Sequence, residues 1–440
     1  MEKMREQIKV HQERAILVGA FLKTDLKKQA NQDVLEELTA LAESAGAIVV
    51  GRFIQRMPQI HAATYIGSGK AAQLADKVKQ AGADVVIFDN DLSPGQIREL
   101  EKIVNVKVLD RSELILDIFA TRAQTRQAKL QVELAQLEYT YPRLTRMWSH
   151  LDTVTGAAGG TGAGAVGGIG TRGTGEKQLE IDRRLVSKRI TELKRDIAAI
   201  DKRKMREIEG RRDVFKISIV GYTNAGKSTL MNALTGAGVY VEDKLFATLD
   251  TRTRRWQPAA GVEVLVSDTV GFVSKLPHHL VASFKATLEE TVHADLLLHV
   301  VDASSPQAFE QIQSVQAVLK ELDCHRKDTL VLLNKADRIA NRSVFEAVQT
   351  VFPDALTISA KTGMNLDVLA GRIVQKVSGG QVRIRITADA ADGRLQSFLR
   401  MAAADLLVEY RDGSVCIEAT LGKNQLAHLQ RLNACQIEYL

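Results

Sequence analysis

Short apolar runs alternate with helix-like patterns over the first quarter of the chain. The apolar runs are residues 15–20, 47–52, 84–89 and 106–110. A periodic pattern of apolar and polar positions, DVLEELTALAESAG, separates the first two runs. Strands that alternate with helices are typical of a parallel sheet. The pattern therefore predicts a small parallel α/β domain over residues 1–110.

Two longer stretches with helical periodicity follow, over residues 111–144 and 175–212. Two long helices joined by a loop predict an αα-hairpin over residues 111–212. The joining segment, residues 156–175, holds 10 glycines among 20 residues and cannot build a core. One interpretation is a flexible linker. The other is a functional tip, because a long loop without its own structure is more often functional than idle.

A further apolar run begins at Val214, breaks into GYTNAGKS and then becomes helical. This motif matches the G-x-x-x-x-G-K-[ST] pattern of a phosphate-binding loop, or P-loop. Gly221 and Gly226 permit the tight turn that aims successive N–H groups at phosphate oxygens. Lys227 is placed to reach the β- and γ-phosphates, and Ser228 to bind Mg²⁺. The run predicts a buried strand, a phosphate-binding loop and the start of a helix.

The segments that a P-loop domain requires follow in order, over residues 213–379. Thr248, in LFATLDT, is placed to reach Mg²⁺ and the γ-phosphate, with a weak preference over Thr251. The apolar run 262–268 ends in DTVG, where Asp268 can hold Mg²⁺ through water and Gly271 can sense the γ-phosphate through its N–H. The sequence thus predicts a metal and phosphate site at these strand ends.

Another apolar run, TLVLLN, leads into NKAD, and the run ALTI leads into SAK. The carboxylate of Asp337 can accept hydrogen bonds from the N1–H and the amino group of guanine, whereas adenine offers no matching pair of donors. A mismatched base would leave buried polar groups unpaired, so such a pocket discriminates strongly. The motifs together predict a guanine-nucleotide-binding domain.

The residue after DTVG is Phe272. Ras-like enzymes place a glutamine there to orient the attacking water. Phenylalanine cannot hydrogen-bond to water, so we expect slow intrinsic hydrolysis, with the missing group supplied from elsewhere in the chain or by a partner. No catalytic residue is assigned.

The net charge of +6 changes the interpretation of the second long helix. Residues 177–212 hold 13 Lys or Arg against 7 Asp or Glu, an excess equal to that of the whole chain. A charge run on a helix is usually a solvated face with i,i+4 pairs. A cationic surplus beside a glycine-rich tip also fits a nucleic-acid contact. The sequence leaves both interpretations open.

Three further features carry less chemistry. Residues 65–70, YIGSGK, could hold an anion at a helix N-terminus, but their spacing lacks the full phosphate-loop pattern and favours a plain turn. The cysteines, Cys324, Cys416 and Cys435, are too scattered for a disulfide framework or a metal site. Residues 380–440 follow a β-α-β-β-α-β order, which predicts a small ferredoxin-like α+β domain with an interaction role.

No apolar run is long enough to cross a membrane, and the N-terminus lacks a secretory signal. We therefore expect a cytoplasmic protein without stable membrane insertion; association with a membrane surface stays open.

The chain resembles the HflX GTPases, a family of translation-factor-related P-loop proteins. The resemblance covers nearly the whole chain and rests on YIGSGK, GGIGTRGTGEKQLEIDRR, GYTNAGKSTLMNAL, LFATLDT, DTVGFVSKLPHHLVASFKATLEET and NKAD. It departs from the family pattern at Lys177 and Ile181, where threonines are typical. The resemblance implies a monomeric, Mg²⁺-dependent GTPase that binds the large ribosomal subunit and its RNA. It also implies a role in rescuing or splitting stalled ribosomes under stress.

Two functions compete with this one. The first is a ribosome-assembly or RNA-binding switch in which GTP hydrolysis times release, and the second adds an ATP-dependent RNA-remodelling activity in the N-terminal domain. The expected metal ligands are Ser228 and Thr248. The expected nucleotide site comprises Gly221, Tyr222, Thr223, Asn224, Ala225, Gly226, Lys227, Ser228, Phe246, Ala247, Thr248, Leu249, Asp250, Asp268, Thr269, Val270, Gly271, Asn334, Lys335, Ala336, Asp337, Ser359, Ala360 and Lys361.

Overall fold

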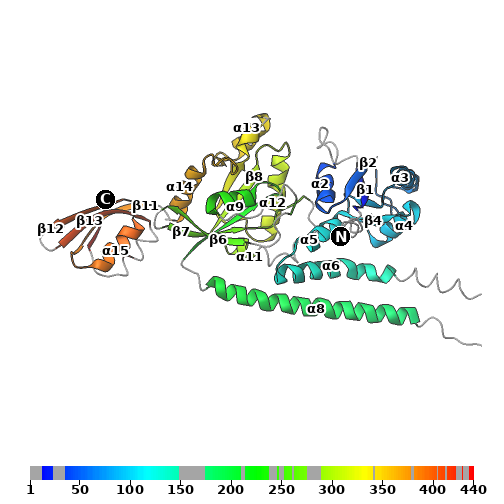
Figure 1. Ribbon diagram of the computed structural model, residues 1–440, viewed down its shortest axis with the longest axis horizontal. Helices are drawn as coiled ribbons and strands as arrows, with labels where there is room; N and C mark the ends of the chain where they lie inside the picture. The colour runs from blue at the N-terminus through cyan, green and yellow to red at the C-terminus, as the bar shows by residue number, and fades with distance from the viewer. Residues whose placement is uncertain are drawn as a thin grey trace, which may run out of the picture. The chain divides into compact units, whose positions relative to one another are not determined.

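The structure is a computed structural model (Figure 1) and its chain divides into two compact units. The first unit holds residues 1–205, 243–250 and 275–286, and the second holds residues 206–242, 251–274 and 287–440. The structure describes residues 12–22, 35–147, 174–209, 214–236, 245–246, 252–259, 262–274, 289–339, 342–377, 381–403, 405–411, 414–422, 429 and 436–440.

The first unit contains a parallel sheet with the strand order β2-β1-β3-β4. Its strands are β1 (Arg14–Leu22), β2 (Ile48–Met57), β3 (Val85–Phe88) and β4 (Lys107–Leu109). Its helices are α2 (Glu36–Ser44), α3 (Ser68–Ala81), α4 (Pro94–Val104) and α5 (Arg111–Arg122). The predicted parallel α/β fold is confirmed, and β2 runs five residues beyond the apolar segment that indicated it.

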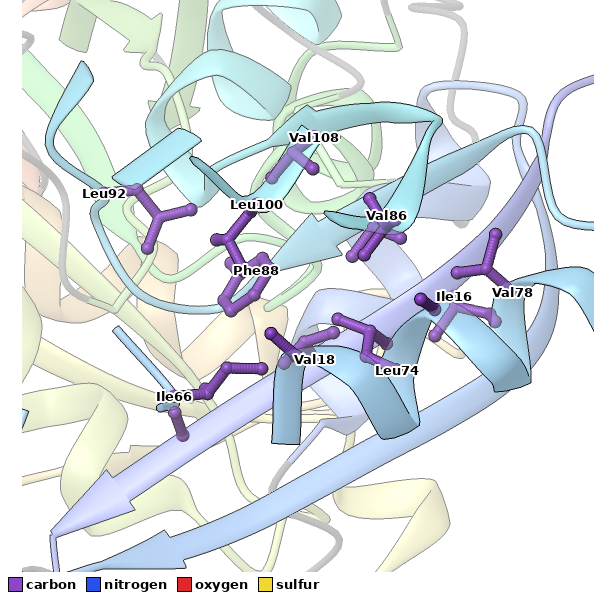
Figure 2. Close-up of a cluster of buried hydrophobic side chains, with 14 of the residues drawn as sticks. Ile16, Val18, Ile66, Leu74, Val78, Val86, Phe88, Leu92, Leu100 and Val108 are labelled. Atoms are coloured by element: carbon purple, nitrogen blue, oxygen red, sulfur yellow. The ribbon is translucent and has the colours of Figure 1, made fainter. Parts of the chain in front are cut away.

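The core of this sheet lies beneath α3 and α4. Figure 2 shows Ile16, Val18 and Val86 from the strands meeting Leu74 of α3 and Leu100 of α4. All five are fully buried. Burying a side chain of this size stabilises a fold by roughly 1.5–3 kcal/mol, so these contacts fix the helices on the sheet.

The first long helical stretch is two helices instead of the continuous one that its periodicity predicted. Helix α5 ends at Arg122, and α6 (Arg126–Met147) begins three residues later. Ala123 is extended at ψ 113°, and the Thr125 hydroxyl accepts a 3.1 Å hydrogen bond from the N–H of Ala128. A threonine in this position is a common helix N-cap. The break lets α6 fold back along α5, so that Arg143 of α6 pairs with Asp110 at the N-terminus of α5 at 3.1 Å.

Helices α6 and α8 (Thr174–Glu209) lie side by side as the predicted hairpin (Figure 1). Leu134 of α6 packs against Leu193 and Ile197 of α8. The predicted glycine-rich tip lies outside the described residues.

The second unit contains a six-stranded sheet with the order β10-β9-β8-β5-β7-β6, in which only β6 is antiparallel to its neighbour among the described strands. The central strand β5 is buried on both faces from Ile217 to Gly221. The elements are β5 (Phe215–Gly221), α9 (Lys227–Thr235), β6 (Arg252–Ala259), β7 (Val262–Asp268), α11 (Glu289–Val292), β8 (Leu296–Asp302), α12 (Ala308–Glu321), β9 (Thr329–Asn334), η3 (Ala336–Arg338), α13 (Arg342–Val351), β10 (Leu356–Thr357) and α14 (Leu366–Val377).

The end of the chain forms an antiparallel sheet with the order β12-β13-β11-β14. Leu395 and Leu399 of α15 pack on one face of it. The segment between β13 and β14, where the predicted β-α-β-β-α-β order requires a second helix, lies outside the described residues apart from buried Leu429. The elements are β11 (Gln381–Asp389), α15 (Gly393–Ala402), β12 (Leu406–Arg411), β13 (Ser414–Gly422) and β14 (Gln436–Tyr439).

Within the described ranges, every helix is too short or too polar to span a bilayer.

Candidate functional site

The phosphate-binding loop connects β5 to α9 in the second unit. It begins at the strand end Gly221 and ends at Gly226, whose φ of +94° is a conformation that favours glycine. A Cβ at Gly226 would collide with the side-chain amide of Asn334. The strand, loop and helix therefore form as predicted, and Gly226 is needed for both its backbone angle and its small size.

Lys227 lies at the start of α9 with 7% of its surface exposed. Its Nζ donates a 2.7 Å hydrogen bond to the carbonyl oxygen of Tyr222. Burial lowers the pKa of Lys227 to about 8, although the nearby Asp268 carboxylate favours the charged form. Phosphate oxygens are stronger acceptors than a carbonyl, so a bound nucleotide would stabilise this ammonium group.

Ser228 and Asp268 come together at the ends of neighbouring elements. The Ser228 hydroxyl donates a 2.6 Å hydrogen bond to Asp268 Oδ2. Asp268 is 1% exposed, and its Oδ1 has no hydrogen-bond partner among the described residues. Burial raises the pKa of Asp268, against the influence of Lys227 and Ser228. A buried carboxylate oxygen without a partner, beside a hydroxyl, is a suitable place for a cation.

The rest of the DTVG turn is fixed to the loop. The Thr269 hydroxyl donates to the carbonyl oxygen of Ile219 at 2.7 Å, which ties the turn to β5. Phe272 is 3% exposed and pairs with Tyr222 as an isolated parallel β-bridge. The side chain after DTVG is therefore buried, and it has no polar atom to orient water.

The NKAD and SAK motifs meet around the amide of Asn334. Its Nδ2 donates to the carbonyl oxygen of Ala225 at 2.8 Å, and its Oδ1 accepts from the N–H of Ala360 at 2.9 Å. This one side chain thus joins the phosphate loop to the SAK segment. The N–H of Ala336 donates to the carbonyl oxygen of Ile358 at 3.1 Å, which holds the two motif loops together.

Asp337 Oδ1 accepts a 2.6 Å hydrogen bond from the Ser359 hydroxyl. That bond lowers the pKa of Asp337, so the side chain is a carboxylate at neutral pH, as recognition of guanine by this group requires.

One partner in this region was missed by the sequence interpretation. Lys335 has the left-handed conformation, φ 61°, and its Nζ forms a 2.7 Å ion pair with Asp302 Oδ2. Asp302 ends β8 and lies opposite Asn334 in the parallel pairing of β8 with β9. Asp302 directly follows a buried apolar run, as the site residues Asp268 and Asn334 do, and this position was the sequence signal that could have identified it.

The expected site residues 246–250 belong to the first unit by chain contacts, and most of them lie outside the described ranges. Phe246 belongs to the first unit, where its ring packs edge-on against Phe119 at 4.7 Å between centroids. Residues 247–250, which include Thr248, are outside the described residues. In YIGSGK, Lys70 Nζ donates to Gln73 Oε1 of its own helix at 2.8 Å, which agrees with a plain turn.

The basic helix α8 is partly neutralised by α6. Arg189 forms two hydrogen bonds to Glu133, at 2.7 and 3.0 Å, and Lys194 pairs with Glu138 at 2.8 Å. Glu133 and Glu138 lie outside residues 177–212, whose charges were counted in the sequence. The positive charge excess on the surface of α8 is therefore smaller than that count predicts.

Four exposed cations remain along one line of α8. They follow one another at intervals of four, seven and seven residues, which places them on one face of a helix with 100° per residue. This set, called the basic stripe below, consists of Arg184, Lys188, Arg195 and Lys202. Lys188 and Arg195 are 74% and 79% exposed, and their acidic neighbours on α8 are 3.9–4.0 Å away.

The fold and the loop geometry define a P-loop GTPase, an enzyme that hydrolyses GTP. Family models match most of the chain: GTP-binding GTPase N-terminal over residues 32–120, GTP-binding GTPase Middle Region over 122–211, and 50S ribosome-binding GTPase over 216–335.

Curated relatives extend over nearly the full length. The chain is 41% identical to GTPase HflX of Magnetococcus marinus over 92% of each chain. It is 39% identical to GTPase HflX of Escherichia coli over 97% of this chain and 98% of that one. The chain therefore belongs to the HflX GTPase family, as its motifs indicated. A solved GTP-binding protein from Sulfolobus solfataricus in complex with GDP is 25% identical over 84% of this chain and 99% of that one, with a TM-score of 0.41.

Proposed function

We propose that this protein is a cytoplasmic GTPase that binds the large ribosomal subunit and separates the subunits of stalled ribosomes under stress. The observation that carries the proposal is the combination of an assembled P-loop and base site with the match of residues 216–335 to the 50S ribosome-binding GTPases. GTP and GDP occupy the site formed by the GYTNAGKS, DTVG, NKAD and SAK motifs.

The arrangement of Ser228 and Asp268 fits a magnesium ion. Mg²⁺ prefers oxygen ligands and keeps several of its waters. Ser228 Oγ would bind the ion directly, Asp268 would hold one of its waters through the oxygen that has no partner, and Thr248 would complete the set with GTP bound. The ion, when bound by these residues, would supply positive charge to the phosphates. Lys227 supplies a second positive charge to the same phosphates.

The base site fits guanine through Asp337. The Ser359 bond lowers the pKa of this carboxylate further and restrains its side chain, so that it could accept hydrogen bonds from a base that offers two donors. Asn334 holds the phosphate loop and SAK at a fixed separation, so the base and the phosphates are bound by one connected structure.

The basic stripe fits ribosomal RNA. Exposed cations on one face of a long helix can follow a phosphate backbone, and their affinity arises from released counterions. The cations of α8 that pair with α6 serve the hairpin itself.

Subunit separation can be tested in sucrose gradients with purified ribosomes and GTP, GDP or a non-hydrolysable GTP analogue. With GTP, the whole-ribosome peak should diminish, the subunit peaks should grow, and the protein should sediment with the large subunit. Lys227→Ala is the control without a working P-loop. Binding to large subunits without separation would instead support the assembly or RNA-binding switch. No sedimentation with either subunit would contradict the ribosomal proposal altogether.

A further inference from the structure

The phosphate loop is bonded to the chain that follows the DTVG turn. The N–H of Thr223 donates to the carbonyl oxygen of Phe272 at 2.7 Å, and the N–H of Phe272 donates to the carbonyl oxygen of Gly221 at 3.1 Å. These two bonds form the parallel bridge between Tyr222 and Phe272. The carbonyl oxygen of Phe272 therefore occupies the N–H of Thr223 and holds the phosphate loop to the turn.

The side chain of Tyr222 adds a third bond. Its hydroxyl accepts a 2.6 Å hydrogen bond from the N–H of Ser274, two residues beyond Phe272. Tyr222 is 7% exposed, so this bond is largely shielded from water. We call the three bonds together the P-loop latch. They connect Gly221, Tyr222 and Thr223 to Phe272 and Ser274 within the second unit.

The closed latch places Gly271 against the phosphate loop. A Cβ built on Gly271 would lie 2.7 Å from Thr223 Cγ2 and 3.0 Å from Lys227 Nζ. In a P-loop, this lysine contacts the β- and γ-phosphates. The backbone at Gly271 therefore lies against the ammonium group of Lys227, which a third phosphate must reach. A γ-phosphate and the closed latch would occupy the same space. GDP, which lacks that phosphate, has no such conflict.

We propose that Tyr222 is a positioning residue that sets the preference of the site for GDP over GTP, because its hydroxyl stabilises the closed latch. GTP must open the latch before the N–H of Gly271 can face the γ-phosphate, so its apparent affinity is reduced by the fraction of molecules in the closed state. GDP binds without that cost. A partner that holds the segment after Gly271 in the open position would favour the GTP state.

The test compares Tyr222→Phe with the unchanged protein and uses no ribosomes, so its outcome is independent of the ribosomal proposal. The variant keeps the ring and removes the hydroxyl that accepts the hydrogen bond from the N–H of Ser274. We expect the ratio of the dissociation constant for a non-hydrolysable GTP analogue to that for GDP to fall about two- to tenfold, the effect of one hydrogen bond. The matched control is Tyr410→Phe, because the hydroxyl of Tyr410 on β12 donates to Gln396 of α15 and its loss should change neither constant.

Amide hydrogen exchange in the unchanged protein tests the latch without any substitution. Residues 272–274 should exchange slowly with GDP and faster with the GTP analogue. Equal exchange in the two states would overturn the proposal. An unchanged ratio of GTP-analogue affinity to GDP affinity in Tyr222→Phe would also overturn the proposal. An equal loss of both affinities would overturn it as well, because that result would indicate that Tyr222 has only a structural role.

Discussion

Ser228 Oγ donates a 2.6 Å hydrogen bond to Asp268 Oδ2, although the two residues are 40 positions apart in the chain. Parallel pairing of β5 with β7 brings the strand end at Asp268 beside the first turn of α9. The pair therefore exists before any ligand binds. A preformed pair of polar side chains would need little reorganisation to hold the proposed metal ion and its water.

Replacement of Ser228 by Ala should weaken the dependence of nucleotide binding on Mg²⁺. We expect the ratio of GTP affinities with Mg²⁺ and with EDTA to fall by about 10-fold or more, the usual cost of losing a group at a metal site. Titration of a fluorescent GTP analogue measures both affinities. The matched control is Ser304→Ala, because Ser304 also donates to an aspartate, Asp302, at 2.6 Å. An unchanged ratio in Ser228→Ala would contradict the metal assignment.

Nucleotide binding should be coupled to protonation of Lys227. Its pKa is about 8 in the absence of phosphates because the side chain is buried. Phosphates favour the ammonium form and raise that pKa, so binding takes up a proton and affinity falls as pH rises through 8. We expect GDP affinity to drop about tenfold between pH 7 and 9. Calorimetry at pH 8 in two buffers with different ionisation enthalpies measures the proton uptake directly, and an absence of uptake would refute the coupling.

Asp337→Asn should change which base is bound. The carboxylate loses its charge, so two hydrogen bonds to guanine weaken and GTP affinity should fall about 10- to 100-fold. An amide can donate to the extra carbonyl of xanthine, so xanthosine triphosphate should bind better than it does to the unchanged protein. Isothermal titration with both nucleotides checks the exchange. Unchanged GTP affinity would show that another group reads the base.

The basic stripe and the paired cations of α8 allow a matched comparison. Lys188→Ala with Arg195→Ala removes two stripe charges, whereas Arg189→Ala with Lys194→Ala removes the two that pair with Glu133 and Glu138. If the stripe contacts RNA, the affinity of the first variant for large subunits should depend less steeply on salt. The magnitude of the slope of log affinity against log salt concentration should fall by about 1.5–2.

The second variant should lower that slope by less than half as much, because its cations are already neutralised. Sedimentation at several KCl concentrations gives the slopes. Equal changes in the two variants would return α8 to the interpretation of a solvated helix face.

The sequence predicted the strand ends well because their chemistry is local. Asp268 and Asn334 follow apolar runs whose length and flanking residues indicate buried strands, and parallel strands bring such ends to one edge of a sheet. Periodicity alone did not locate the break between α5 and α6, since both helices carry apolar positions on the same spacing. The capping residue Thr125 was the local signal for that break.

The contacts that periodicity cannot reveal join segments distant in sequence. The pairing of Arg189 with Glu133 depends on how the two hairpin helices align, and the bond from Ser274 to Tyr222 depends on how the chain turns after Gly271. Neither segment contains a motif that specifies its partner. Side-chain packing in three dimensions decides both.

We expect the ribosome to activate this GTPase, as the proposed function requires. Phe272 is buried and cannot orient water, so the unaided enzyme should turn over slowly. Large subunits should raise turnover by about 10-fold or more, a modest demand beside the ~10³–10⁵ that an inserted arginine supplies in other GTPases. The measurement is multiple-turnover phosphate release at fixed salt with and without purified large subunits, with Lys227→Ala as the blank. A rise that depends on large subunits would support the account, and equal rates in the two conditions would contradict it.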